Sequence, residues 1–113
     1  MITRNHNVKY ELNGLSFTWD SEKYDKNIKN HKITFEEAAS VFLDLMTIYR
    51  PDDKHSEEEE RDIVIGLSNT VSILFVCSCQ REEGDVIRIF SARKATSEEI
   101  KEWKEENDDY KHN

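Results

Sequence analysis

The residues of this chain best suited to chemistry lie between positions 85 and 95. The stretch begins with the β-branched and aromatic residues that are typical of a strand. It also carries polar side chains that a purely structural strand does not need, namely Arg88, Ser91, Arg93 and Lys94. Guanidinium groups present a fixed fork of N–H donors that matches phosphate oxygens. We therefore expect this stretch both to pack against a core and to present cations to a phosphate-bearing ligand.

More polar side chains are scattered along the rest of the chain. They are Lys26, His31, Arg50, His55, Glu60 and Arg61. Together with residues 85–95 they make an inventory suited to cutting RNA without a metal. That reaction needs a base for the ribose 2′-hydroxyl, cations for a phosphorane-like transition state and an acid for the leaving 5′-oxygen. Histidine fills either proton role, because its ordinary pKa of about 6.5 lies near working pH.

Each of these side chains also has a purely structural interpretation. His31 would complement the helix dipole if it ends a helix, and His55 in a wholly polar loop would be a solvated surface side chain. Arg88 would pair across strands with an acidic residue, and Arg93 would bind backbone carbonyls or an acidic patch. The lysines of the first predicted helix are typical of surface charge. The residues alone leave both interpretations open.

The familiar motifs of other enzyme classes do not occur in the sequence. With three glycines the chain has no Gly-rich phosphate loop, and it has neither a His-Glu-x-x-His motif nor two Cys-x-x-Cys pairs. Nothing singles out one serine as a nucleophile. Cys77 and Cys79 are two apart, which places both on one face of a strand. One Cys-x-Cys is a weak metal motif, so we interpret both as buried free thiols.

Length and charge set further limits. The 113 residues predict one domain over 1–113, with a poorly defined extension at 1–14, a core at 15–107 and a disordered tail at 108–113. A net charge of −8 is unfavourable for nucleic-acid binding, but the acidic residues gather at 57–60 and after 97, which leaves other surfaces free to be basic. We see no signal peptide and no membrane-spanning run, so we expect a cytoplasmic protein with reduced thiols.

Hydrophobic periodicity predicts the secondary structure. The expected elements are, in chain order, a weak strand over 8–12, a strand over 15–19, helices over 21–30 and from 34 to about 46, strands over 47–50, 62–67, 71–77 and 85–92, and a helix from 96 to about 107. The last three strands follow one another through short connections, which predicts an antiparallel meander. The class is therefore α+β: an antiparallel sheet of this meander plus additional strands, with two N-terminal helices packed on it and a C-terminal helix.

An ordered set of short motifs resembles the BrnT toxin family of bacterial type II toxin–antitoxin systems. The motifs run in order from residue 17 to about residue 100. They are Phe17-x-Trp19-Asp20 with Lys23, Asn27 and Lys29-x-His31; Ile33-x-Phe35-Glu36-Glu37-Ala38; Tyr49-Arg50-Pro51-Asp52-Asp53-Lys54-His55-Ser56; Glu59-Glu60-Arg61 with Ile65-Gly66; and Asp85-Val86-Ile87-Arg88-Ile89-x-Ser91-Ala92-Arg93-Lys94-Ala95-Thr96. The family often has a glycine in the loop after the histidine, where this chain has four glutamates, Glu57–Glu60.

The resemblance implies a RelE-like fold and a ribonuclease that inhibits translation without a metal or other cofactor. It also implies a cognate ribbon-helix-helix antitoxin, through which alone the toxin would contact DNA. The residues it marks as catalytic are His55, Arg61, Arg88 and Arg93, with His55 as acid or base and Arg88 and Arg93 on phosphate. Lys26, His31, Arg50 and Lys94 would bind RNA or phosphate. The alternative function is a non-catalytic partner and co-repressor of the antitoxin.

Overall fold

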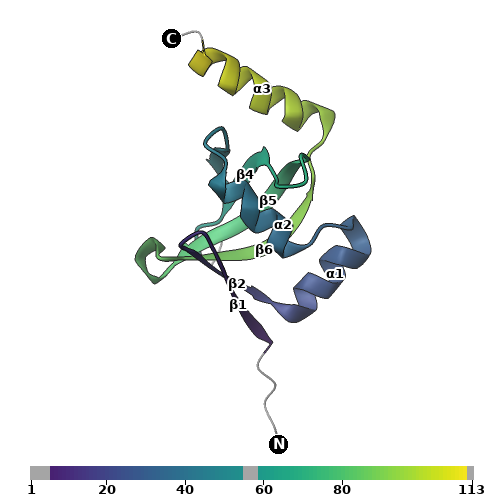
Figure 1. Cartoon of the computed structure of the whole chain (residues 1–113), viewed down its shortest axis with the longest axis vertical. Coiled ribbons are helices and arrows are strands. Elements are labelled where there is room, and N and C mark those ends of the chain that lie inside the picture. Colours follow the sequence, from purple (N-terminus) through teal and green to yellow (C-terminus); the bar gives the residue numbers. More distant parts are fainter. Residues whose placement is uncertain (1–5, 55–58, 112–113) are drawn as a thin grey trace, which may run out of the picture.

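A computed structural model describes residues 6–54 and 59–111, without the side chains of residues 109–111. Its elements are β1 (Asn7–Leu12), β2 (Leu15–Asp20), α1 (Ser21–His31), α2 (Phe35–Ser40), the 3₁₀ turn η1 (Val41–Leu43), β3 (Ile48–Pro51), β4 (Asp62–Leu67), β5 (Ile73–Arg81), η2 (Glu82–Gly84), β6 (Val86–Lys94) and α3 (Ser97–Lys111). Figure 1 shows α1 and α2 beside the sheet, and α3 at the end farthest from the N-terminus. None of the described helices is long and apolar enough to cross a membrane.

The six strands form one mixed sheet in the order β1-β2-β6-β5-β4-β3. The predicted α+β class and the antiparallel meander β4-β5-β6 are confirmed. The prediction of a wholly antiparallel sheet is wrong, because β2 pairs in parallel with β6. Two helices and three strands separate these two strands in sequence, which gives the chain the long crossover that a parallel pair requires.

One face of the sheet packs against α1 and α2 through an aromatic core. Phe17 and Trp19 of β2 are 1% and 2% exposed, and Phe35 of α2 is fully buried. The Trp19 ring lies edge-on to Phe35 at 5.7 Å and stacks with Tyr24 of α1 at 5.9 Å. Aromatic burial of this kind dominates the stability of a small core. This aromatic core therefore fixes both helices to β2, the strand that pairs with β6.

Helix α1 is tied to β6 by one buried amide. The Nδ2 group of Asn27 donates to the carbonyls of Ile33 and Ala92, and its Oδ1 accepts from the Ala92 N–H. Strand β2 pairs with β6 only as far as Arg88, so the edge of β6 beyond it needs another partner. Asn27 supplies that partner for the backbone of Ala92. Helix α1 is thus held beside the cation-bearing end of β6.

The second helix is shorter than its hydrophobic spacing predicts. It ends at Ser40 and passes through η1, so Met46, predicted to lie in the helix, lies outside it. Asp44 explains the change, because its carboxylate accepts from the backbone N–H groups of Met46 and Leu67. Such local side-chain bonds compete with helical ones. The result is a tight turn that leads directly into β3.

Strand β5 runs to Arg81, past its predicted end at residue 77, and β6 and α3 also extend past their predicted ends. Strand β6 continues to Lys94, so Arg93, predicted to lie just past the strand, belongs to it. The helix expected to end near Asn107 continues to Lys111. Its start forms a full capping box, in which Thr96 and Glu99 each accept from the backbone N–H of the other. The capping box therefore fixes the start of α3 shortly after the end of β6.

Candidate functional site

The face of the sheet opposite α1 and α2 carries a line of arginines. In β6, Arg88, Ser91 and Arg93 pair with Cys79, Cys77 and Phe75, which alternate along β5 and so share one face. The row of Ser91 and Cys77 continues through Ile63 of β4 to Arg50 of β3. We call this surface the arginine face, defined by Arg50, Arg88, Ser91 and Arg93. Two strands that are far apart in sequence, β3 and β6, thus bring predicted site residues to one surface.

A bulge in β6 makes this arrangement possible. Cys77 pairs with Ser91 whereas Ser78 pairs with Ile89, so Phe90 is the extra residue. The bulge shifts the alternation of the strand. As a result Ile89 and Ala92 both face the core, while Ser91 and Arg93 both face the opposite side.

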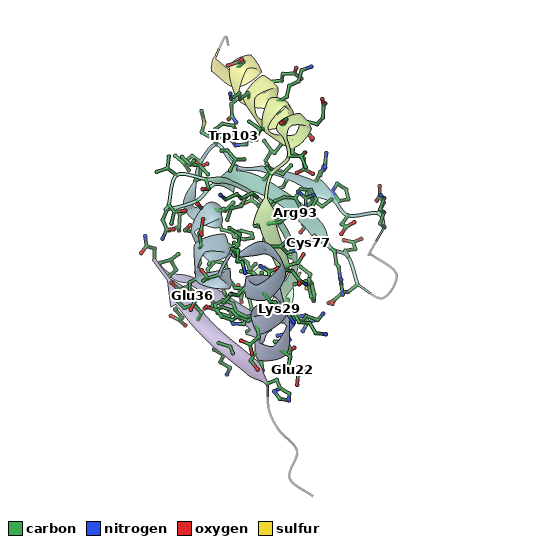
Figure 2. The ribbon with its side chains drawn as sticks, turned by 90° about the vertical axis from the view of Figure 1, so that its right-hand side faces the viewer. Glu22, Lys29, Glu36, Cys77, Arg93 and Trp103 are labelled. Carbon is green, nitrogen blue, oxygen red and sulfur yellow. The ribbon has the colours of Figure 1, made fainter. Side chains whose placement is uncertain are left out.

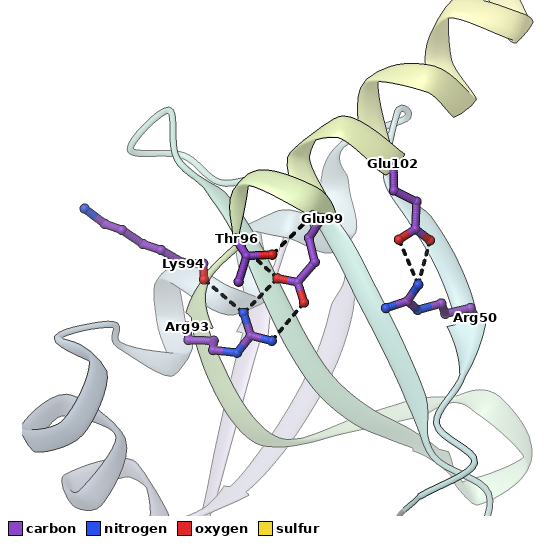
Figure 3. Close-up of polar contacts among 6 residues, drawn as sticks. All are labelled: Arg50, Arg93, Lys94, Thr96, Glu99 and Glu102. Carbon is purple, nitrogen blue, oxygen red and sulfur yellow. Dashed lines mark hydrogen bonds and ion pairs between the residues drawn. The ribbon is translucent and has the colours of Figure 1, made fainter.

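Arg93 is held by a carboxylate of α3. Its two terminal nitrogens donate to the two oxygens of Glu99 at 2.7 and 2.9 Å (Figure 3). The guanidinium also stacks on Phe75 at 3.9 Å and donates to the Lys94 carbonyl at 3.2 Å. This ion pair holds the pKa of Glu99 below its usual value and raises the pKa of Arg93 further. Arg93 therefore faces α3 with its charge compensated.

Arg50 has an equivalent partner one turn further along α3. One of its terminal nitrogens donates to both oxygens of Glu102, at 2.7 and 2.8 Å. Glu99 and Glu102 are three residues apart and so lie on the same side of the helix. Figure 3 shows both carboxylates pointing from α3 toward the sheet. Helix α3 thus places carboxylates on two cations that the sequence predicts to bind phosphate.

Arg88 lies at the other end of the arginine face. It donates to the neutral side-chain amide oxygen of Asn7, in edge strand β1, at 2.6 Å. This bond orients the guanidinium without cancelling its charge. Arg88 is half-buried, so it remains reachable from solvent. The structural interpretation, in which an acidic residue pairs with it across strands, does not describe this contact.

Phe90 gathers two more cations at the bulge. The Arg61 guanidinium lies 3.9 Å from the centre of the Phe90 ring, and the Lys23 ammonium of α1 lies 5.1 Å from it. We call these three residues the Phe90 cluster. An aromatic ring attracts cations to its faces, so Phe90 lets two like charges share a small region.

The remaining predicted residues fall outside these contacts. Lys26 and His31 are exposed on α1, and His31 is the last residue of that helix, where a cation complements the helix dipole. Lys94 is exposed at the end of β6. His55 lies outside the described residues. The described chain thus brings together Arg50 and Arg93 under α3, and Arg61 at the Phe90 cluster.

The two cysteines are free, as interpreted from sequence, but only Cys79 is buried, whereas Cys77 is half-buried. Burial raises the pKa of the Cys77 thiol, although a hydrogen bond from Ser91 opposes the shift. Figure 2 shows Cys77 next to Arg93. The Cys79 thiol donates to Glu59, which is also ion-paired with Arg81 at 2.9 Å. Glu59 is therefore anchored to β5.

Several residues of the site are not among those predicted from sequence. They are Lys23, Phe75, Phe90, Glu99 and Glu102. Lys23 was visible as part of a basic helix, and Glu99 as half of a capping box, but neither signal indicates a contact with an arginine. Among the described residues, no group of three or more His, Cys, Asp or Glu side chains could hold a metal ion.

Comparison with known proteins places this geometry in context. A family model described as the ribonuclease toxin BrnT of type II toxin–antitoxin systems matches residues 19–99. The match covers α1 through the first residues of α3, including the arginine face and the Phe90 cluster. A search of curated proteins finds no match.

Proposed function

Because the chain belongs to the family of BrnT ribonuclease toxins of type II toxin–antitoxin systems, we propose that it cleaves RNA at the arginine face without a metal and so inhibits translation. A cognate ribbon-helix-helix antitoxin neutralises it and carries the complex to DNA. The observation that carries this proposal is the alignment of Arg88, Ser91 and Arg93 on one face of β6. A surface of fixed guanidinium donors suits a reaction whose transition state gathers negative charge on phosphate oxygens.

Arg88 is the best-placed phosphate ligand among the described residues. Its charge is oriented by Asn7 but not neutralised, and it is reachable from solvent. Its fork can hold two oxygens of one phosphate, which orients the bond to be broken. In this mechanism Arg88 binds the scissile phosphate and stabilises the charge that develops as the 2′-oxygen attacks.

The proton transfers are assigned to His55. The ribose 2′-hydroxyl must lose a proton and the departing 5′-oxygen must gain one, and imidazole serves either step near neutral pH. Arg61, six residues after it in the chain, is fixed on Phe90 and supplies positive charge near the strand that carries Arg88. Lys26, His31 and Lys94 then act on phosphates away from the cleavage point, since they are exposed.

Arg50 and Arg93 act in the same mechanism once α3 releases them. In the free protein each of them binds a carboxylate of α3, Arg93 through two nitrogens and Arg50 through one. A phosphate could accept hydrogen bonds from either guanidinium in the same geometry. The acidic residues of the chain are concentrated in part on this helix, whose first turn holds Glu98 and Glu99. Once α3 moves away, its carboxylates no longer offset the arginine face, so a chain of net charge −8 still presents a surface that suits RNA.

Controlled expression in a bacterium tests the proposal. The wild-type chain should arrest growth and deplete cellular RNA, and Arg88→Ala or His55→Ala should relieve the arrest. Lys29→Ala, which removes an exposed charge of α1 away from the arginine face, should remain toxic. Full toxicity of both site variants would refute the site assignment. Harmless wild-type expression with intact RNA would instead favour the co-repressor alternative.

A further inference from the structure

The largest exposed apolar side chains of the described residues point to a second functional surface. Leu45 is 98% exposed, and Leu43, two residues before it, is 38% exposed. A leucine that is 98% exposed buries almost no apolar area in the fold that holds it. Two such side chains within one short segment mark a surface for another molecule.

Hydrogen bonds on both sides fix the backbone of residues 44–47. The Asp44 carboxylate accepts from the backbone N–H groups of Met46 and Leu67, and the Asp44 carbonyl accepts from the Thr47 N–H. On the other side, Asn107 of α3 donates to the Met46 carbonyl at 3.1 Å. Leu45 therefore stands at the tip of a fixed turn. A surface that is already ordered loses little entropy on binding a partner.

The turn and α3 enclose a groove of about 460 Å³, lined by Leu45, Met46, Thr47, Ile48, Glu106 and Asn107. Its floor is mostly aliphatic. Glu106 of α3 lines one side of it, and the neighbouring helix residues Glu105 and Asp108 are also exposed, against one exposed lysine, Lys104. An apolar floor beside an acidic border fits a segment that has one apolar and one basic face.

We infer that this groove is a docking site for the antitoxin, and that its occupant is a basic amphipathic helix of that partner. The inference rests on the proposed function for the identity of the partner. A helix of this kind would place apolar side chains against Leu45 and Ile48 and would set lysine or arginine side chains against Glu106. The residues that line the groove are distinct from those of the arginine face, so antitoxin docking and RNA cleavage can be measured independently.

Two other occupants fit the groove less well. A strand added to the open edge of β3 would find only four residues, the last of which is Pro51 and has no N–H to donate. A second copy of this chain would bring its own acidic border and a net charge of −8 against the first. A basic helix meets neither obstacle.

Calorimetric titration of the purified chain with its full-length cognate antitoxin tests the inference. Leu45→Glu should weaken the complex by about tenfold or more, since it puts a charge on the apolar floor. Its matched control is Val71→Glu, which changes a side chain that is 80% exposed and does not line the groove. The control should bind as tightly as the wild type. Glu106→Lys should also weaken binding, more strongly at low salt.

Equal binding by Leu45→Glu and the wild type would overturn the inference, and so would equal losses in Leu45→Glu and Val71→Glu. A structure of the complex with a strand on β3 or a second copy of the chain in the groove would do the same. RNA cleavage is measured on the same free proteins, and Leu45→Glu should cleave as the wild type does. If the wild type cleaves no RNA, the proposed function fails while the antitoxin affinities still decide where the antitoxin docks.

Discussion

Replacing Glu99 by glutamine removes one charge and leaves the shape of α3 intact. Glutamine still fills the capping box, because its amide oxygen can accept from the Thr96 N–H. What is lost is the ion pair with Arg93, in which the glutamate side chain is 15% exposed and the arginine side chain 34%. Solvent screens a pair of this exposure, so we expect the free energy of unfolding to fall by about 1 kcal/mol. For a chain of this size that lowers Tm by about 4 °C.

The pH dependence of this loss follows from the pKa of Glu99. Arg93 holds that pKa below its ordinary value of 4.5, so the carboxylate stabilises the fold above pH 4.5 and loses this effect as pH falls through the lowered pKa. Denaturant unfolding at several pH values should show the variant less stable near pH 7 and the difference vanishing in acid. Glu98→Gln, an exposed neighbour in the same turn, is the matched control and should change stability little.

The same substitution should strengthen RNA binding, because it frees the Arg93 guanidinium for phosphate. Fluorescence anisotropy with a short single-stranded RNA should give a lower Kd for Glu99→Gln than for Glu98→Gln, although both variants lose one negative charge. The gain should shrink at high salt. Equal stability of Glu99→Gln and the wild type at neutral pH, or equal RNA affinity of the two variants, would refute the reasoning about α3.

Three further substitutions probe how the site is positioned. Phe90→Leu removes the ring beneath Arg61 and should slow RNA cleavage severalfold with little loss of stability, as a cleavage assay beside thermal unfolding would reveal. Asn27→Ala leaves buried backbone groups of β6 without their partner and should cost about 3 kcal/mol of unfolding free energy in a urea titration. Gly66→Ala would drive a methyl group into Thr47 and should lower stability by about 1–3 kcal/mol in the same titration. An unchanged urea midpoint in either of the last two would contradict the packing described.

The sequence predicts the elements of this fold because short-range patterns determine them. The Asn13-Gly14 turn, the Asp20 cap of α1 and the capping box at Thr96 each act over only a few residues of the chain. The parallel pairing of β2 with β6 depends on contacts between residues about 70 positions apart, as in Phe17 with Ile87. No local pattern reports such a contact.

The same distinction between local patterns and long-range contacts applies to the candidate site. Its arginines are visible in the sequence because cations inside a strand are unusual, and Arg88 and Arg93 do share one face. Their partners are not visible, since Glu99 and Glu102 read as ordinary surface residues of an amphipathic helix. The role of Phe90 is not visible in the sequence for another reason. Phe90 forms a bulge, which is a change in the register of strand pairing, and the pairing with β5 determines that register.

RNA cleavage by the purified chain tests the central claim most directly. The wild type, incubated with single-stranded RNA and excess EDTA, should cleave it and leave 2′,3′-cyclic phosphate ends, because the 2′-oxygen is the attacking group. Arg88→Ala should reduce the rate by about 10²-fold or more, since it removes a donor to the transition state, while Lys29→Ala should match the wild type. Cleavage that EDTA abolishes, or an Arg88→Ala variant as fast as the wild type, would contradict the account.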